Sequence, residues 1–151
     1  MILETERLIL RPFTENDAAD AFEYLHEPMV HCFACMKTET MEDARKAVLD
    51  RAKDGEFYFA ITLKESGKVI GEIDAMPEAT APDEEIAARD TFSPCWMLNP
   101  AYHGKGYAYE AAHAFFDYLF NEKEARRSYA YTEDYNVSSQ KLCEKLGMRS
   151  E

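Results

Sequence analysis

Residues 56 to 75 constrain the fold most, because apolar side chains recur there at every second position. The residues that share the first apolar face are Phe57, Phe59, Ile61 and Leu63. A Glu-Ser-Gly turn at 65–67 follows, and a second alternating segment runs through 69–73. Two such segments joined by turn residues predict an antiparallel β-hairpin. The chain must therefore contain a sheet whose apolar face is covered by other elements.

Helices and further strands surround this hairpin in the sequence. A helix is expected after Thr14 or Asn16, and a second one starts at Thr40, where Asp43 completes a capping box. The second helix is expected to bury Met41, Ala44 and Val48. Strands are predicted at 8–11, 91–98 and 128–132, and two more helices over 108–119 and between Asn136 and Gly147. This order predicts a mixed α+β fold, with helices on the faces of the sheet.

Composition excludes several classes of protein. Of 151 residues, 46% are hydrophobic, which suits one compact domain over residues 1–151. The formal net charge of −12 repels polyphosphate, so we expect no nucleic-acid partner. No apolar run approaches the roughly 18 residues of a membrane span, and the charged first ten residues do not resemble a secretory signal. We therefore expect a cytoplasmic protein that does not enter a membrane.

The cysteines are too sparse and irregular for a disulfide framework, and we expect them to be reduced. His31, Cys32 and Cys35 are metal-ligand residue types, but a structural zinc site needs four ligands and no second pair exists. We therefore expect no metal site.

The stretch from Leu98 to Ala112 carries the clearest chemical signal, because a strand ends there, two glycines turn the chain and a helix begins. Unpaired amides at such a helix start bind phosphate without help from side chains. The spacing fits neither a P-loop nor a dinucleotide fingerprint. From spacing alone, an anion site and a plain glycine turn are equally good interpretations.

Residues 103 to 108, His-Gly-Lys-Gly-Tyr-Ala, resemble the pyrophosphate loop of the GCN5-related N-acetyltransferases (GNAT), in which Arg or Gln, two residues, Gly, one residue and Gly or Ala follow one another. Gly106 and Ala108 match this pattern, and His103 departs from it. The segments at 5–11, 98–100, 110–111, 136–139 and 144–148 are similar to the branch that includes the ribosomal-protein N-terminal acetyltransferases. The resemblance implies a mostly antiparallel sheet, splayed between the strands at 91–98 and 128–132.

The resemblance also implies acetyl-CoA as co-substrate. Its pantetheine arm would lie along the strand that ends at Met97 and Leu98, where a backbone amide would stabilise the oxyanion, and Asn136 would bond the arm. Its pyrophosphate would bind the amides of Gly104, Lys105, Gly106, Tyr107 and Ala108. The His103 side chain either touches phosphate, with Lys105 compensating for the missing permanent charge, or is a surface group.

Transfer to an amine needs an acid for the leaving thiolate and a base for the amine proton. By resemblance, Ser139 is the acid that protonates the thiolate. Alternatively, Ser139 is a structural helix residue whose hydroxyl bonds the preceding turn. Tyr135 is the second candidate acid. Glu72 is a candidate base if it points over the acceptor site, and otherwise a solvated strand residue. His31 and a water chain are the rival bases.

Charge is divided unevenly, with a net −11 in residues 1–98 and −1 in residues 99–151. The acidic part includes the helices that wall the acceptor side in the resembled family, so a cationic amine is favoured. We therefore expect an N-acetyltransferase that modifies a protein N-terminus, a polyamine or a cationic small molecule. The alternative is an acyl-CoA-binding module or inactive relative without turnover.

The resembled family continues beyond its last helix into one or two strands, and this chain stops at Glu151. We therefore expect that the C-terminal hairpin is missing and that the strand at 128–132 has an open edge. An open edge favours pairing with a second chain, so we expect either self-association through this edge, as in a homodimer, or a fold that is less stable than one with the hairpin.

Overall fold

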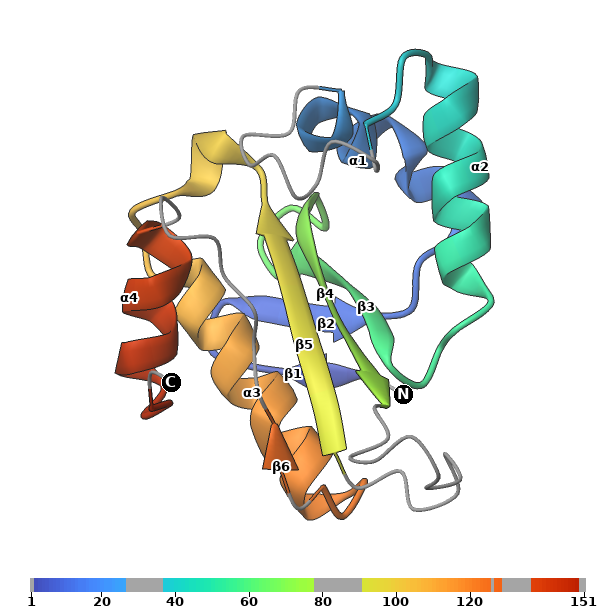
Figure 1. Ribbon diagram of the computed structural model, residues 1–151. Helices are drawn as coiled ribbons and strands as arrows, with labels where there is room; N and C mark the ends of the chain where they lie inside the picture. Colours follow the sequence, from blue (N-terminus) through green and yellow to red (C-terminus); the bar gives the residue numbers. More distant parts are fainter. Residues whose placement is uncertain (1, 27–36, 78–90, 126, 129–136, 150–151) are drawn as a thin grey trace.

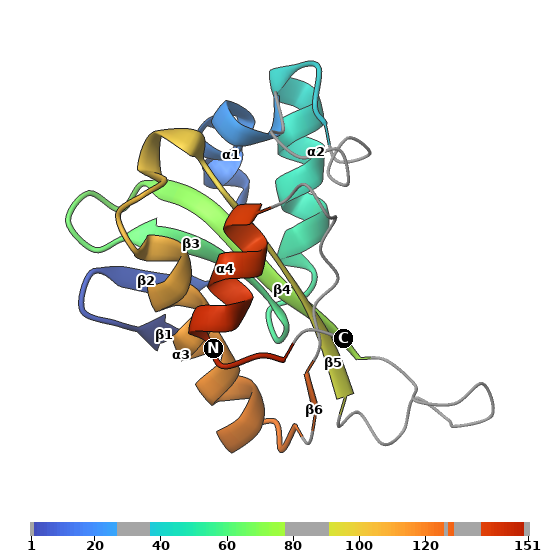
Figure 2. The same ribbon diagram turned by 60° about the vertical axis from the view of Figure 1, so that its left-hand side comes forward.

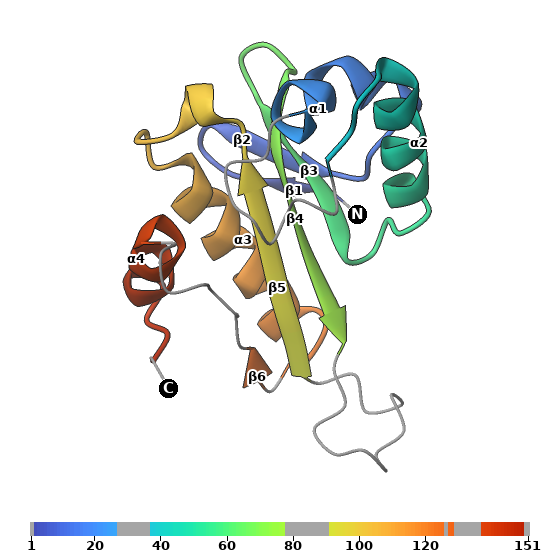
Figure 3. The same ribbon diagram turned by 45° about the horizontal axis from the view of Figure 1, so that its top comes forward.

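The computed structural model describes residues 2–26, 37–77, 91–125, 127–128 and 137–149, and all structural statements below concern these residues. Within them a sheet with the strand order β1-β2-β3-β4-β5-β6 separates α1 and α2 on one side from α3 and α4 on the other (Figures 1 and 3). The strands are β1 (Leu3–Glu4), β2 (Leu8–Arg11), β3 (Tyr58–Leu63), β4 (Val69–Pro77), β5 (Thr91–Leu98) and β6 (Arg127–Ser128). The predicted mixed α+β class is confirmed.

The β3–β4 hairpin forms the middle of the sheet, as the alternation in residues 56–75 predicts, with Tyr58 opposite Asp74. The pairs from β1 to β5 are antiparallel, and β5 pairs with β6 in parallel. The described parallel pairing is confined to Thr91 and Phe92 at the start of β5. The expected splay of the strands beyond this point falls at 129–132, outside the described residues.

The helices are α1 (Ala18–Leu25), α2 (Met41–Ala52), α3 (Tyr107–Asn121) and α4 (Val137–Lys145). A short 3₁₀ helix, η1 (Glu15–Asp17), follows Thr14 and leads into α1. The predicted capping box of α2 is present, because Asp43 N donates to Thr40 Oγ1 over 3.1 Å. The expected burial of Met41 is wrong: it is the first residue of α2 and is 44% exposed, whereas Ala44 and Val48, further along the helix, are buried.

Apolar side chains cover both faces of the sheet. On the α3 face, Phe59 and Ile61 of β3 pack with Phe115 and Leu119 of α3. On the α1/α2 face, the packed residues include Ala21, Tyr24, Val48, Ala60 and Met97. Because antiparallel partners share a face, Ala60, Glu72 and Met97 form one row across this face, and Tyr58, Asp74 and Cys95 form the next.

Candidate active site

The loop that joins β5 to α3 has the geometry of an anion site. The 3₁₀ helix η4 (Pro100–Tyr102) follows β5, and Gly104 and Gly106 then adopt φ values of 76° and 82°, which disfavour other residues. The recorded hydrogen bond that opens α3 runs from Glu110 N to Gly106 O, so the amides of residues 107–109 precede the first intrahelical bond. Among the described residues other than Gly104 and its two neighbours, no heavy atom lies within 4 Å of a Cβ built on Gly104. This loop therefore presents amides beside open space.

The His103 ring turns back onto the strand, because its Nε2 lies 2.9 Å from Leu98 O. A carbonyl only accepts, so Nε2 carries a proton there. Lys105 is exposed, and its Nζ lies 5.6 Å from the centroid of the Tyr102 ring. In this arrangement Lys105 offers a positive side chain at the loop, and His103 bonds the last carbonyl of β5.

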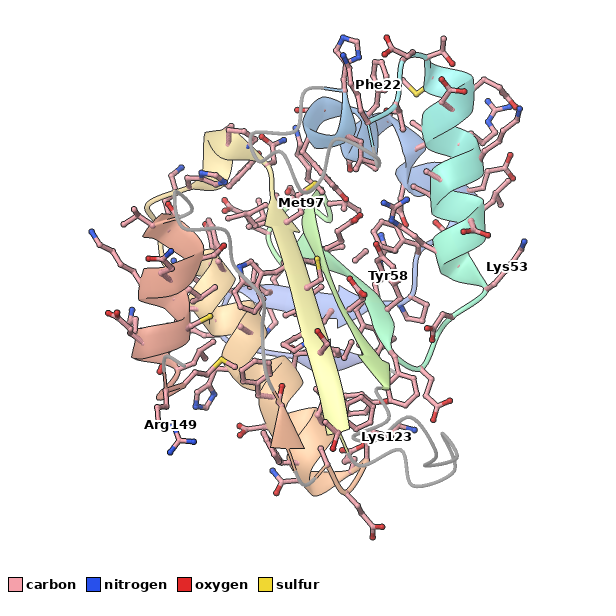
Figure 4. The ribbon with its side chains drawn as sticks, in the orientation of Figure 1. Phe22, Lys53, Tyr58, Met97, Lys123 and Arg149 are labelled. Atoms are coloured by element: carbon pink, nitrogen blue, oxygen red, sulfur yellow. The ribbon has the colours of Figure 1, made fainter. Side chains whose placement is uncertain are left out.

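The backbone of β5 is held tightly against β4 just before this loop. A Cβ on Gly71 would collide with Met97 O, so glycine is required where β4 passes β5. The Met97 side chain is 7% exposed and points to the α1/α2 face, where Figure 4 labels it. Leu98 packs on the opposite face, so the two predicted pantetheine-strand residues belong to different faces.

Ser139 lies on α4, which runs beside α3 (Figures 1 and 3). Trp96 of β5 donates from Nε1 to Ser139 Oγ over 3.2 Å. The serine thus hydrogen-bonds to the strand proposed to hold the pantetheine arm. The other predicted residues Tyr135, Asn136 and His31 lie outside the described residues.

Glu72 is not a solvated strand residue, because only 2% of it is exposed. Tyr24 Oη donates to Glu72 Oε2 over 2.9 Å, and Tyr58 Oη donates to Oε1 over 2.9 Å. The Arg51 guanidinium also donates to Oε1, with Nη2 at 3.1 Å. The solvated-face alternative failed because residues of α1, α2 and β3 converge on this carboxylate, which a period-two pattern does not reveal.

The protonation states of this network follow from burial and from the Glu72 charge. Both effects raise the pKa of Tyr24 and Tyr58, so the two hydroxyls keep their protons and donate. Burial opposes the charge of Arg51, but the Glu72 carboxylate raises the pKa of this guanidinium above its usual value. The Glu72 carboxylate therefore binds three fixed donor groups, and it ties both helices to the sheet.

Asp74 stands two residues after Glu72 on the same face of β4 and lies largely out of solvent. No hydrogen bond or ion pair joins it to another residue in the described part of the chain. Burial, and then the negative charge of Glu72, raise the pKa of Asp74 from 3.8 to about 7. This carboxyl can therefore exchange a proton near neutral pH, as a general base must.

Sequence reasoning missed Asp74, Trp96 and Arg7 as residues of the site. The signal for Asp74 was available, since a second acid at i+2 on an otherwise apolar strand shares the face of Glu72. The bond from Trp96 to Ser139 spans 43 positions, so no local sequence pattern reveals it. Arg7 belongs to the segment at 5–11, which is similar to the family, but the sequence assigned it no role. Its partner Lys105 is 98 positions further along the chain.

Comparisons with known proteins identify the family. A family model for the acetyltransferase (GNAT) domain matches residues 7–149, so the chain belongs to the GNAT acetyltransferases. Over 151 residues it is 30% identical to YnaD, an uncharacterized N-acetyltransferase of Bacillus subtilis (strain 168), with 100% of this chain and 84% of YnaD covered. The resemblance inferred from the loop is confirmed, and the chain is a GNAT-family N-acetyltransferase.

Solved structures agree with this assignment. A GNAT-family acetyltransferase from Bacillus anthracis matches with a TM-score of 0.86 and 30% identity, covering 100% of this chain and 85% of that one. RimL, a ribosomal L7/L12 α-N-protein acetyltransferase in complex with coenzyme A, shares the fold with a TM-score of 0.73 at 13% identity. That match covers 97% of this chain and 82% of RimL.

Neither a membrane-spanning helix nor a cluster of metal-ligating side chains is present in the described residues. No helix there has the length and apolar character needed to cross a membrane. The same part of the chain contains no group of three or more His, Cys, Asp or Glu residues able to hold a metal ion. Cys32 and Cys35 lie outside it.

Proposed function

We propose that this enzyme transfers the acetyl group of acetyl-CoA to a primary amine. The observation that carries the proposal is the loop at residues 103–106, with two glycines at positive φ and the unpaired amides that open α3. The coenzyme A bound in the RimL structure supports this donor for a chain of the same fold. In such a reaction the donor supplies an activated thioester, which the amine attacks.

The chain's own residues divide the binding of this donor between the loop and β5. The amides of Gly104, Lys105, Gly106, Tyr107 and Ala108 would bind the pyrophosphate, and the Lys105 ammonium would add a positive charge. The backbone of Met97 and Leu98 would pair with the pantetheine arm, with Asn136 as a further partner. An amide near Met97 would stabilise the oxyanion that forms when the amine attacks.

Ser139 is the proposed acid for the departing thiolate, with Tyr135 as the second candidate. The Trp96 bond supports this role, because it fixes the Ser139 hydroxyl next to the strand on which the thioester would lie. A positioned hydroxyl gives its proton more effectively than a mobile one, since the geometry is set before the reaction.

Asp74 suits the role of base better than Glu72 does. The Glu72 carboxylate already accepts from Tyr24, Tyr58 and Arg51, and taking a proton would break the ion pair with Arg51. Asp74 has no such partner in the described part of the chain, and it pairs across the sheet with Cys95 of β5. We therefore assign proton acceptance to Asp74 and the support of this face to Glu72.

The acceptor would approach from the α1/α2 side, because both helices belong to the acidic part of the chain, with a net charge of −11 over residues 1–98. An acidic face favours a cationic molecule, whether a protein N-terminus or a small amine. An α-amino group, with a pKa near 7.7 to 8.0, is already partly neutral at pH 7 and needs less help from a base than a lysine does. The similarity in fold to RimL, a ribosomal L7/L12 α-N-protein acetyltransferase, supports a protein N-terminus as the acceptor.

An acceptor screen tests the proposal directly. Purified enzyme with acetyl-CoA is offered peptides with free and acetylated N-termini, polyamines and small amines, and thiol release is followed. Faster thiol release with a free amine than with its acetylated form supports transfer. Binding of acetyl-CoA without amine-dependent thiol release across the screen would favour the acyl-CoA-binding module.

Three further expectations stay predictions: a single domain, a cytoplasmic location and a homodimer. Light scattering at several protein concentrations checks the homodimer.

A further inference from the structure

The turn between β1 and β2 clamps the start of α3 (Figure 2). Glu110, in the first turn of α3, accepts from Arg7 Nε over 2.8 Å and from Arg7 N over 2.9 Å. Thr5 Oγ1 donates to the same carboxylate over 2.5 Å. Arg7 Nη1 donates to Lys105 O over 2.9 Å, and its guanidinium carbon lies 4.3 Å from the centroid of the Tyr107 ring. One arginine thus contacts the glycine loop, the first helical residue and the helix's first turn.

The bond to Lys105 O orients an amide of the loop. The carbonyl of Lys105 and the N–H of Gly106 belong to one trans peptide unit, in which they point in opposite directions. Holding the carbonyl toward Arg7 therefore directs the Gly106 amide away from Arg7. Gly106 lacks a side chain that could cap α3, so the contact with Arg7 restrains the glycine loop from outside.

The ion pair between Arg7 and Glu110 persists across a wide pH range. Burial opposes the charge of Glu110, but the hydrogen bonds from Thr5 and Arg7 keep the pKa of this carboxyl below its usual value. The hydrogen bond to Glu110 raises the pKa of Arg7. Pairing also offsets a negative charge that would otherwise face the phosphates at the helix start.

We propose that Arg7 and Glu110 are positioning residues that fix the loop amides for the pyrophosphate of acetyl-CoA. The inference rests on the proposed function, because it assumes that this loop binds the donor. It assigns a role to the segment at residues 5–11 and to Glu110, which are far from each other in the sequence and adjoin in the structure.

The test compares coenzyme A with pantetheine, which lacks the pyrophosphate, as calorimetric ligands. Arg7→Gln should weaken coenzyme A binding about tenfold, the effect of losing one charge-assisted hydrogen bond, and leave pantetheine binding unchanged. The affinity of Arg7→Lys for coenzyme A should lie between those of wild type and Arg7→Gln, because an ammonium makes a single point of contact where the planar guanidinium makes several. Arg45→Gln on α2 is the matched control, since Arg45 is also a half-exposed, ion-paired arginine.

Glu110→Gln separates positioning from simple charge. Removing a negative charge near the phosphates would strengthen coenzyme A binding if charge alone mattered. If Glu110 positions the loop, the variant should instead bind coenzyme A at least threefold more weakly, because the glutamine amide has one accepting oxygen where the carboxylate has two. Unchanged or tighter binding in this variant, or equal losses for pantetheine, would overturn the inference. If wild-type protein binds no coenzyme A, the proposed function itself fails.

Discussion

Asp74 lowers the stability of the fold, because burial and the Glu72 charge hold the pKa of its carboxyl above the value in the unfolded chain. A carboxyl with a folded pKa near 7 keeps its proton at pH values where the unfolded chain, with a pKa near 3.8, has released it. The folded state then binds more protons, so the free energy of unfolding falls as the pH rises from about 4 to about 7. Above the folded pKa this contribution is constant.

Asp74→Asn should therefore raise the free energy of unfolding relative to wild type, with a gain that is larger at pH 8 than at pH 4.5. Urea titrations of both proteins at the two pH values measure this difference. The same variant should lower kcat/KM by about 10² to 10⁴, the usual contribution of a general base. An equal gain at both pH values would refute the raised pKa, and full activity would refute the role as base.

Ser139→Ala should lower kcat while the Kd for acetyl-CoA stays nearly unchanged, because a proton donor to the departing thiolate acts only after binding. Trp96→Phe should lower kcat less, since it removes the hydrogen bond to Ser139 and keeps an aromatic ring in the strand. Ser138→Ala, at an exposed position beside Ser139 on α4, serves as the control. Parallel losses in affinity and rate would instead make Ser139 a binding residue and pass the acid role to Tyr135.

Alanine substitutions at Gly106 and Gly67 test whether the loop before α3 binds the donor. Gly106 and Gly67 have similar positive φ values of 82° and 74°. Gly67 lies in the β3–β4 turn, where no described residue other than its two neighbours comes within 4 Å of an added Cβ. Alanine at either position adds the strain of a left-handed residue, about 1 kcal/mol. Only at Gly106 would the methyl group also meet Arg7, at 3.4 Å from Nη2.

Gly106→Ala and Gly67→Ala should therefore lose similar stability, and only Gly106→Ala should lose affinity for acetyl-CoA, by about tenfold. Thermal melts report the first quantity and calorimetry the second. Equal affinities in the two variants would show that the loop at 103–106 does not bind the donor.

Local signals were sufficient for most elements and insufficient for the contacts between them. The capping box fixed the start of α2, and the alternation at 57–73 fixed the central hairpin, because both depend on neighbours in the sequence. The two-residue strand β1 has too short a pattern to detect, and it forms only because Leu3 pairs with Leu10. The Glu72 network joins α1, α2 and β3 through tertiary packing, which no local pattern encodes.

Under the proposed function, one acidic molecule must bind both an anionic donor and a cationic acceptor. Lys105 and Arg7 stand at the loop that would meet phosphates, whereas Glu72 and Asp74 lie on the α1/α2 face that would meet an amine. An anionic donor would then meet the positive groups of the loop, and a cationic acceptor would meet the α1/α2 side. The uneven charge of the two parts of the sequence predicts the acidic α1/α2 side but not the position of Arg7, which the fold brings from the acidic part to the loop before α3.

Acetyl-CoA should stabilise the whole fold, because a ligand that binds only the native state adds RT ln(1 + [L]/Kd) to the free energy of unfolding. At a hundredfold excess over Kd this is about 2.7 kcal/mol. For a chain of this size each kcal/mol raises Tm by about 2 to 4 °C, so the expected shift is roughly 5 to 10 °C. ADP, which has a pyrophosphate and no pantetheine arm, should produce a smaller shift. A melt unmoved by millimolar acetyl-CoA would contradict binding at this site, and an equal shift with ADP would show that β5 contributes nothing to it.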